Sequence, residues 1–116
     1  KVFVMLTCGC MQNNNGNARA GIKILRGSTD ITVGDDATGF ESGAGVCGRS
    51  NDGGHHQFGA VVSVLDSPST TSATTYKVQM ARGPDAAGTV YLNRSGNQDS
   101  NSVNTITTLT LMEIEG

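Results

Sequence analysis

Two segments of the chain, VFVMLTCGCM at residues 2–11 and FGAVVSVL at residues 58–65, are predominantly apolar at odd and even positions alike. Their β-branched and aromatic residues favour strands, in which successive side chains point to opposite faces. In the first strand, one face carries Val2, Val4, Leu6 and Cys8, and the other carries Phe3 and Met5. In the second strand, one face carries Phe58, Ala60, Val62 and Val64, and the other carries Val61 and Leu65. A strand that is apolar on both faces must be covered twice.

The remaining chain alternates between short strand-like runs and polar turns. IKILRGSTDITV predicts strands around residues 22–26 and 31–33, with RGSTD as a turn or bulge between them. TTYKVQM predicts a strand with Tyr76, Val78 and Met80 inward and Lys77 and Gln79 outward, and GTVYLNRS and NTITTLTLMEI predict the last two strands. QNNNGNARAG is expected to be a loop. Short strands at this spacing predict an all-β fold, an antiparallel β-sandwich.

Length and charge restrict the organisation and the partners. A chain of 116 residues suits a single domain over 1–116, and its first residue, Lys1, suggests a piece of a longer protein. The 8 basic and 10 acidic side chains are too balanced to indicate a nucleic-acid partner. KVFVMLTCGC resembles a signal or lipoprotein segment, but its apolar run is too short to span a bilayer and suits a strand equally well, so no membrane insertion is expected.

Three cysteines, Cys8, Cys10 and Cys47, cannot form a closed disulfide set, and no fourth completes a zinc site of usual spacing. Cys8 and Cys10 would share one face of a strand, where small buried hydrophobic side chains are the expected role. A paired-cysteine or metal-binding role is the alternative.

The segment SVLDSPSTTSATTY at residues 63–76 predicts a stiff polar corner between two strands. Pro68 fixes its own φ and keeps Ser67 extended, and the Asp66 carboxylate is expected to accept hydrogen bonds from backbone amides two residues on. The strand before the corner is apolar on both faces and the one after it alternates. The corner is therefore expected to lead from a shared interior to a sheet that faces solvent.

Residues 34–57 form a Gly-rich stretch that predicts a long surface loop without regular structure. Binding residues concentrate on loops held by a rigid scaffold, so its densest polar cluster is the hypothesised receptor contact. This cluster consists of Arg49, Asn51, Asp52, His55 and His56. Simple solvation of the loop is the alternative.

Chemistry at the loop is a weaker interpretation. Asp35, Asp36 and Glu41 lack the ordered spacing of a calcium loop, and adjacent histidines point to opposite faces of an extended chain. No nucleophile elbow, HExxH or phosphate loop is present, and Cys47 with a loop histidine would lack a rigid scaffold. We expect no metal, no cofactor, no catalytic residue and no enzymatic activity.

Three segments carry a family resemblance: LDSPSTTSATTYKVQM, GTVYLNRSG and NTITTLTLMEIEG. In order and spacing they resemble the C-terminal domain common in bacteriophage virion fibre proteins, most clearly over residues 59–114, and ILRGSTDI resembles an earlier part of the pattern. The resemblance implies a jelly roll similar in shape to tumour-necrosis-factor and C1q heads, a homotrimer, and a place in the virion, on a tail or capsid fibre. Its implied partners are other virion proteins and a host-surface glycan or protein.

The expected function is therefore that of a non-enzymatic, structural viral protein, a trimerising cap at the distal end of a tail or head fibre that binds a receptor on the host surface. A purely structural capsid-decorating or trimer-folding domain is the alternative. A small glycan-hydrolysing domain would need paired carboxylates on rigid strands. Glu113 and Glu115 are the nearest such pair, and their position at the end of the chain favours a solvated strand end.

Overall fold

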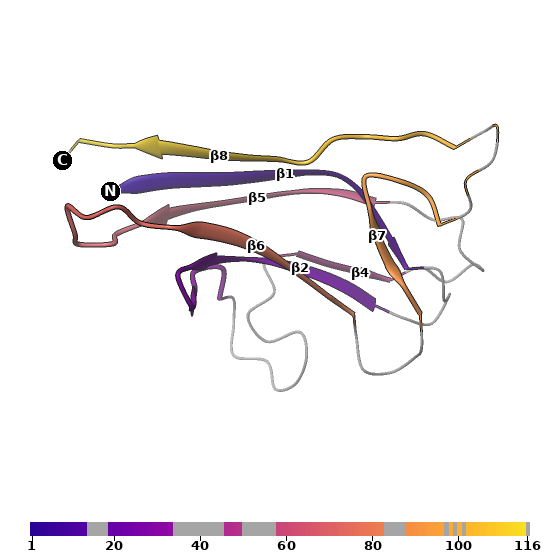
Figure 1. The fold of residues 1–116 in the computed structure, drawn as a ribbon, viewed down its shortest axis with the longest axis horizontal. Helices are drawn as coiled ribbons and strands as arrows, with labels where there is room; N and C mark the ends of the chain where they lie inside the picture. Colours follow the sequence, from indigo (N-terminus) through magenta and orange to yellow (C-terminus); the bar gives the residue numbers. More distant parts are fainter. Residues whose placement is uncertain are drawn as a thin grey trace.

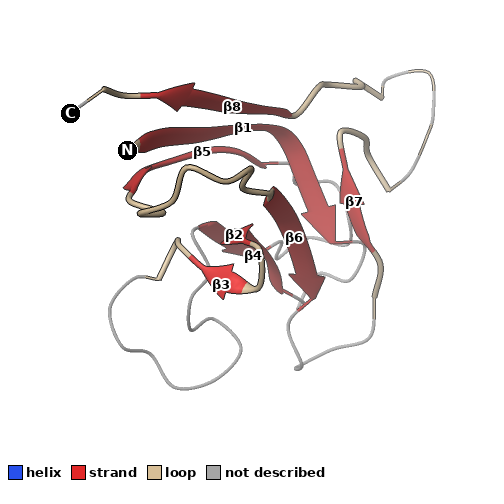
Figure 2. Cartoon of the chain, turned by 60° about the vertical axis from the view of Figure 1, so that its left-hand side comes forward, coloured by secondary structure: helices blue, strands red, loops and turns tan. Residues whose placement is uncertain are grey.

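The computed structural model describes residues 1–13, 19–33, 46–49, 58–82, 88–96, 98, 100 and 102–115, and its regular structure there is entirely β. Two four-stranded antiparallel sheets pack as two layers (Figures 1 and 2). The fold therefore defines an all-β protein of the antiparallel sandwich class, which confirms the predicted fold class at that level. No helix within these residues is long and apolar enough to cross a membrane.

Sheet A is built around its longest strand, β1 (Val2–Asn13). One edge of β1 pairs with β5 (Phe58–Asp66), and the other pairs with β8 (Thr108–Glu113) and then with β7 (Val90–Leu92). The first and last strands of the chain thus lie side by side, and the Ile114 N–H donates to the Lys1 carbonyl at 2.8 Å.

Sheet B is built around β2 (Arg19–Arg26) in the same way. One edge of β2 pairs with β6 (Tyr76–Arg82), and the other pairs with β3 (Thr29–Asp30) and β4 (Val46–Arg49).

The core lies between the sheets and is formed by alternate residues of each central strand. Val4, Leu6 and Cys8 of β1 pack with Ala20, Ile22 and Ile24 of β2, and all are at most 3% exposed. The inward residues predicted for β6 pack against this cluster, while Lys77 and Gln79 are exposed. Of the two apolar faces predicted for β5, the one with Phe58, Ala60, Val62 and Val64 packs inward, and Val61 and Leu65 are exposed on the other. The period-two assignment of faces is confirmed for these strands, because side-chain direction in a strand is fixed by the backbone pleat.

A bulge in β1 allows the chain to cross closely over it. The register with β5 shifts between Cys8 and Met11, and the segment before β8 passes over Gly9. A Cβ placed on Gly9 would lie 2.3 Å from the Ile106 carbonyl oxygen and 2.5 Å from the Thr105 hydroxyl oxygen. Only glycine fits at this crossing.

Several predicted element boundaries are wrong. The strand expected around residues 31–33 is instead the short β3, because Gly27, with φ of 59°, gives a tight turn that lets pairing restart at Thr29. The Asp30 carboxylate then accepts bonds from the N–H and hydroxyl of Thr32, both 2.9 Å, which directs the chain away from the ladder. The loop expected at residues 12–21 is shorter, since β1 continues to Asn13 and β2 begins at Arg19.

The Gly-rich stretch at residues 34–57 is also not wholly irregular. β4 lies within it and pairs with the first half of β2, so that Val46 stands opposite Ile22. Its remaining residues lie outside the described part of the chain.

The corner at residues 67–75 carries the chain from β5 in sheet A to β6 in sheet B. Its hydroxyl groups serve its own backbone: Thr70 Oγ1 accepts from the Ser72 N–H at 3.0 Å, and the Thr74 hydroxyl donates to the Ser72 carbonyl at 3.2 Å. The predicted crossing to a sheet that faces solvent is confirmed, and the shared interior expected for the strand before the corner stays a prediction. The predicted role of Asp66 is not confirmed, as described below.

Candidate interaction surfaces

The outer face of sheet A is uncharged throughout β1, β5 and β8. Register places its residues in three rows across the strands: Leu65, Phe3 and Met112; Ser63, Met5 and Thr110; Val61, Thr7 and Thr108. Val61, Leu65 and Met112 are 63%, 52% and 46% exposed, although they are large apolar side chains. We call these nine residues the A surface. Five of them are large apolar residues and four are Ser or Thr, and exposed apolar side chains grouped in this way are typical of an interaction site.

The outer face of sheet B is different in character. Lys23 stands opposite Gln79, and Leu25 stands opposite Lys77. The Lys23 ammonium also pairs with the Asp30 carboxylate at 3.3 Å. Charged and polar side chains of this kind suit contact with water. Among the described side chains, the outer face of sheet A therefore has the composition of a covered surface and that of sheet B does not.

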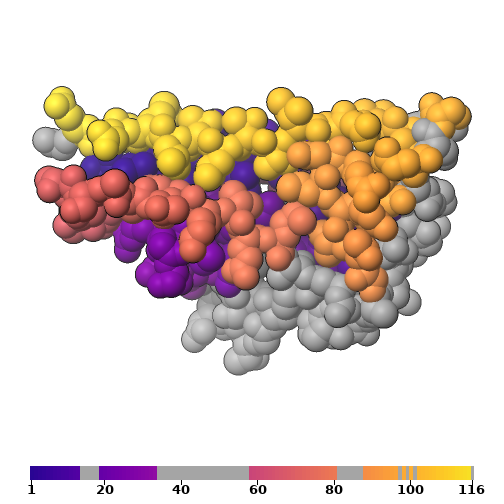
Figure 3. Space-filling model, viewed as in Figure 1, coloured from indigo at the N-terminus to yellow at the C-terminus, as the bar shows by residue number. Residues whose placement is uncertain are grey.

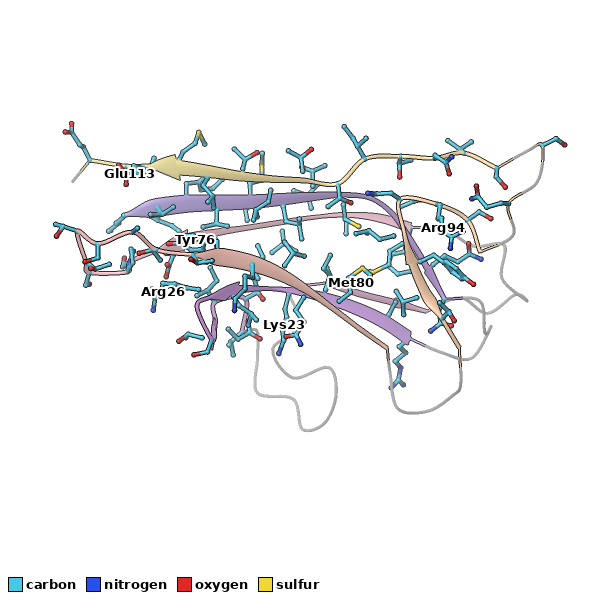
Figure 4. The ribbon with its side chains drawn as sticks, in the orientation of Figure 1. Lys23, Arg26, Tyr76, Met80, Arg94 and Glu113 are labelled. Atoms are coloured by element: carbon cyan, nitrogen blue, oxygen red, sulfur yellow. The ribbon has the colours of Figure 1, made fainter. Side chains whose placement is uncertain are left out.

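The two sheets are joined at one end by a polar cluster that the sequence reasoning missed. Asp66, only 8% exposed, accepts a hydrogen bond from Arg26 Nη1 at 2.6 Å on one carboxylate oxygen and from the Tyr76 hydroxyl at 2.8 Å on the other. Arg26 and Tyr76 are opposite one another in sheet B, and Figure 4 shows them at the corner end of the sandwich. We call this group the inter-sheet clamp.

The clamp corrects the expectation that Asp66 caps the corner backbone. Asp66 is the next inward-pointing residue of β5 after Val64, and Arg26 is the next inward-pointing residue of β2 after Ile24. The two opposite charges therefore meet between the sheets. The sequence held a signal for this pair: Arg26 continues the inward positions of Ile22 and Ile24, and Asp66 continues those of Val62 and Val64. Each apolar inward row thus ends in a charge, and the two charges are opposite. Burial raises the pKa of Tyr76 to about 12, helped by its hydrogen bond to Asp66 and by the negative charge of that carboxylate, while the charge of Arg26 lowers it.

A pocket of about 390 Å³ opens beside the clamp. It lies between the corner, including Pro68, and the adjacent ends of β1 and β8, with Tyr76 in its wall. Figure 3 shows the first residues, in indigo, set back between the yellow C-terminal strand and the pink corner. We call this the end pocket.

The two buried cysteines confirm the expected role as small buried side chains. Cys8 and Cys10 are free and only 3% and 4% exposed, and the Thr105 hydroxyl donates to Cys10 Sγ at 3.2 Å. Burial raises the pKa of the Cys8 thiol, opposed by a hydrogen bond with Thr107. Across the described ranges, no three His, Cys, Asp or Glu side chains are grouped as they would be to hold a metal ion.

The hypothesised receptor contact falls largely beyond the described residues. Arg49 is the last residue of β4, with its backbone opposite Arg19. Asn51, Asp52, His55 and His56 lie outside the described part, as do Asp35, Asp36 and Glu41. The described residues instead form the inter-sheet clamp and the end pocket, and neither was predicted as a site.

Comparison of the chain with protein-family models, with curated proteins and with solved structures found no match.

Proposed function

We propose that this chain is a non-enzymatic domain of a bacteriophage virion fibre protein, a jelly roll that forms a homotrimer and caps the distal end of the fibre. The observation that carries the proposal is the A surface: it is uncharged and combines five large apolar side chains with four hydroxyl residues, whereas the outer face of sheet B carries lysines. Its partner in the proposal is a second and a third copy of the same chain.

The charge pattern is the reason for choosing a copy of the same chain as the partner. Rotation about a three-fold axis brings the same residues of each subunit close together near the axis. A charged residue there would face its own like charge, which is destabilising, whereas Phe3, Leu65 and Met112 form a row that can meet itself. The trimeric state and the virion location follow from the resemblance of residues 59–114 to phage fibre domains.

Assembly is tested by sedimentation velocity of the chain at micromolar concentration. Leu65→Lys places a charge on the A surface, and Gln79→Lys places the same charge at an exposed outward position of sheet B. We expect a trimer for the unmodified chain and for Gln79→Lys, and a monomer with unchanged far-UV circular dichroism for Leu65→Lys. A monomeric unmodified chain would contradict the proposal, and so would a Leu65→Lys variant that remains trimeric.

Host contact is the second part of the proposal, and the polar residues that follow β4 in the sequence are its candidate. Since β4 is part of sheet B, the test leaves Val46–Arg49 intact and changes Asn51, Asp52, His55 and His56 to serine. Fibres that carry this variant should assemble but attach poorly to host cells. Undiminished attachment would instead favour the purely structural capsid-decorating or trimer-folding role.

A further inference from the structure

The end pocket has hydrogen-bonding groups that the protein itself does not use. The hydroxyls of Thr70 and Thr74 are bonded within the corner, but the hydroxyls of Thr71 and Ser72 bond to no other described side chain or backbone group. The carboxylates of Glu113 and Glu115 in the opposite wall are likewise exposed and unbonded within the described chain.

The pocket exists because the inner face of β8 is not covered at this end. Residues 109, 111 and 113 share that face, and Leu109 packs against the core, whereas Leu111 is 46% exposed and Glu113 is exposed. At position 113, β8 therefore presents a carboxylate beside Val2, across from the corner, instead of an apolar side chain. Figure 4 shows Glu113 and Tyr76 at the same end of the sandwich.

We infer that the end pocket binds a neutral sugar residue of a glycan. Its polar groups are two hydroxyls, which both donate and accept, two carboxylates, which accept from ligand hydroxyls, and the Lys1 ammonium, which donates to them. Between them lie apolar atoms of Val2, Pro68 and Leu111, which suit the C–H face of a sugar ring. Such a mixture of apolar wall and few placed polar groups is typical of small-ligand sites, and about 390 Å³ is within their usual range of roughly 300–1,000 Å³.

The charges of the pocket argue for a neutral ligand. Charges of both signs line it, the carboxylates of Glu113 and Glu115 and the side chain and N-terminus of Lys1, so an ion of either sign would meet like charge. An alkyl chain would leave the hydroxyls of the corner unpaired. The pocket also lies between the corner and β8, on the side of sheet A that faces sheet B, so association through the A surface leaves it open. The inference rests on the proposed function in one respect only, that the bound sugar belongs to a glycan of the host surface.

Binding is tested by amide chemical-shift titration of the isotopically labelled chain with methyl glycosides of glucose, galactose, mannose and N-acetylglucosamine. We expect saturable shifts at residues 70–74 and 111–115 for at least one of the four. Glu113→Gln and Thr71→Val should each raise the Kd of that sugar by about tenfold. The first replaces a charge-assisted hydrogen bond to the ligand by a weaker neutral one, and the second removes a hydrogen bond. The matched control Ser28→Ala removes an exposed hydroxyl from the turn of sheet B and should leave the Kd unchanged.

The inference is wrong if none of the four sugars produces saturable shifts, or if Glu113→Gln and Thr71→Val bind as tightly as the unmodified chain. Sedimentation of the same sample reports its assembly state separately. A monomer that binds the sugar would overturn the proposed trimer but support the sugar site. A trimer that binds none of the sugars would support the proposed assembly and overturn the sugar site.

Discussion

Asp66→Asn is the substitution that most sharply tests how the two sheets are held together. The asparagine has nearly the shape of the aspartate and keeps an acceptor oxygen, but it removes the negative charge between Arg26 and Tyr76. In the native chain those partners lie 2.6 and 2.8 Å from the two carboxylate oxygens, and Asp66 is 8% exposed. The variant therefore leaves the Arg26 guanidinium without its counter-charge.

The expected loss follows from these contacts. A hydrogen bond to a charged group contributes about 1.5–3 kcal/mol, and breaking a fully buried ion pair costs about 3–5 kcal/mol. The Arg26 side chain is 29% exposed, so water compensates part of its lost partner. We expect the free energy of unfolding to fall by about 2–4 kcal/mol, a large part of the roughly 5–15 kcal/mol typical of a domain.

Urea unfolding followed by far-UV circular dichroism measures this loss, at one fixed protein concentration because association raises apparent stability. Glu113→Gln is the matched control: Glu113 stands opposite Val2 in the same row as Asp66 and loses the same charge, but it is exposed. Its effect should stay within about 0.5 kcal/mol. An equally small effect of Asp66→Asn would refute the clamp as a major link between the sheets.

Three further outcomes are expected from particular residues. Because the pKa of Tyr76 is raised from its ordinary 10 to about 12, the unfolded chain loses this proton at a lower pH than the folded chain. The free energy of unfolding should therefore keep this contribution below pH 10 and lose it toward pH 12. In urea unfolding at alkaline pH, Tyr76→Phe should remove that part of the decline. Gly9→Ala should lower stability by about 1–3 kcal/mol in urea unfolding, since its Cβ would meet the Ile106 carbonyl at 2.3 Å, and an unchanged midpoint would contradict the close crossing. Cys8 should react with iodoacetamide far more slowly in native than in urea-unfolded protein, as mapped by mass spectrometry; equal rates would show that its thiol is not buried.

The faces of the long strands could be predicted from the sequence because they depend only on local alternation. Tyr76 to Met80 alternate between apolar and polar residues, and the backbone pleat converts that period directly into inward and outward positions. For Phe58 to Leu65 the pleat separates the residues into two faces, but both faces are apolar, so the sequence did not decide which one points inward. The crossing of the corner between the sheets was predictable for a related reason, since the two strands that it joins differ in the polarity of their outer faces.

Features that depend on pairing between distant segments could not be predicted in this way. Arg26 and Asp66 are 40 positions apart, and only the packing of β2 against sheet A brings them together. The four residues of β4 show little strand character alone and are ordered as a strand by pairing with β2. The end pocket likewise arises where β8 extends past the core beside the corner, a relation that no local pattern specifies.

The most direct test of the central proposal is the oxidation rate of Met112, which lies in the row of the A surface with Phe3 and Leu65. This thioether is exposed in a single chain and becomes covered when copies associate through that surface, so its conversion to the sulfoxide by hydrogen peroxide reports coverage. Mass spectrometry should show slow oxidation of Met112 in the unmodified chain at micromolar concentration and fast oxidation in Leu65→Lys. Equal, fast oxidation in both would show that the A surface is open to water and would contradict assembly through it.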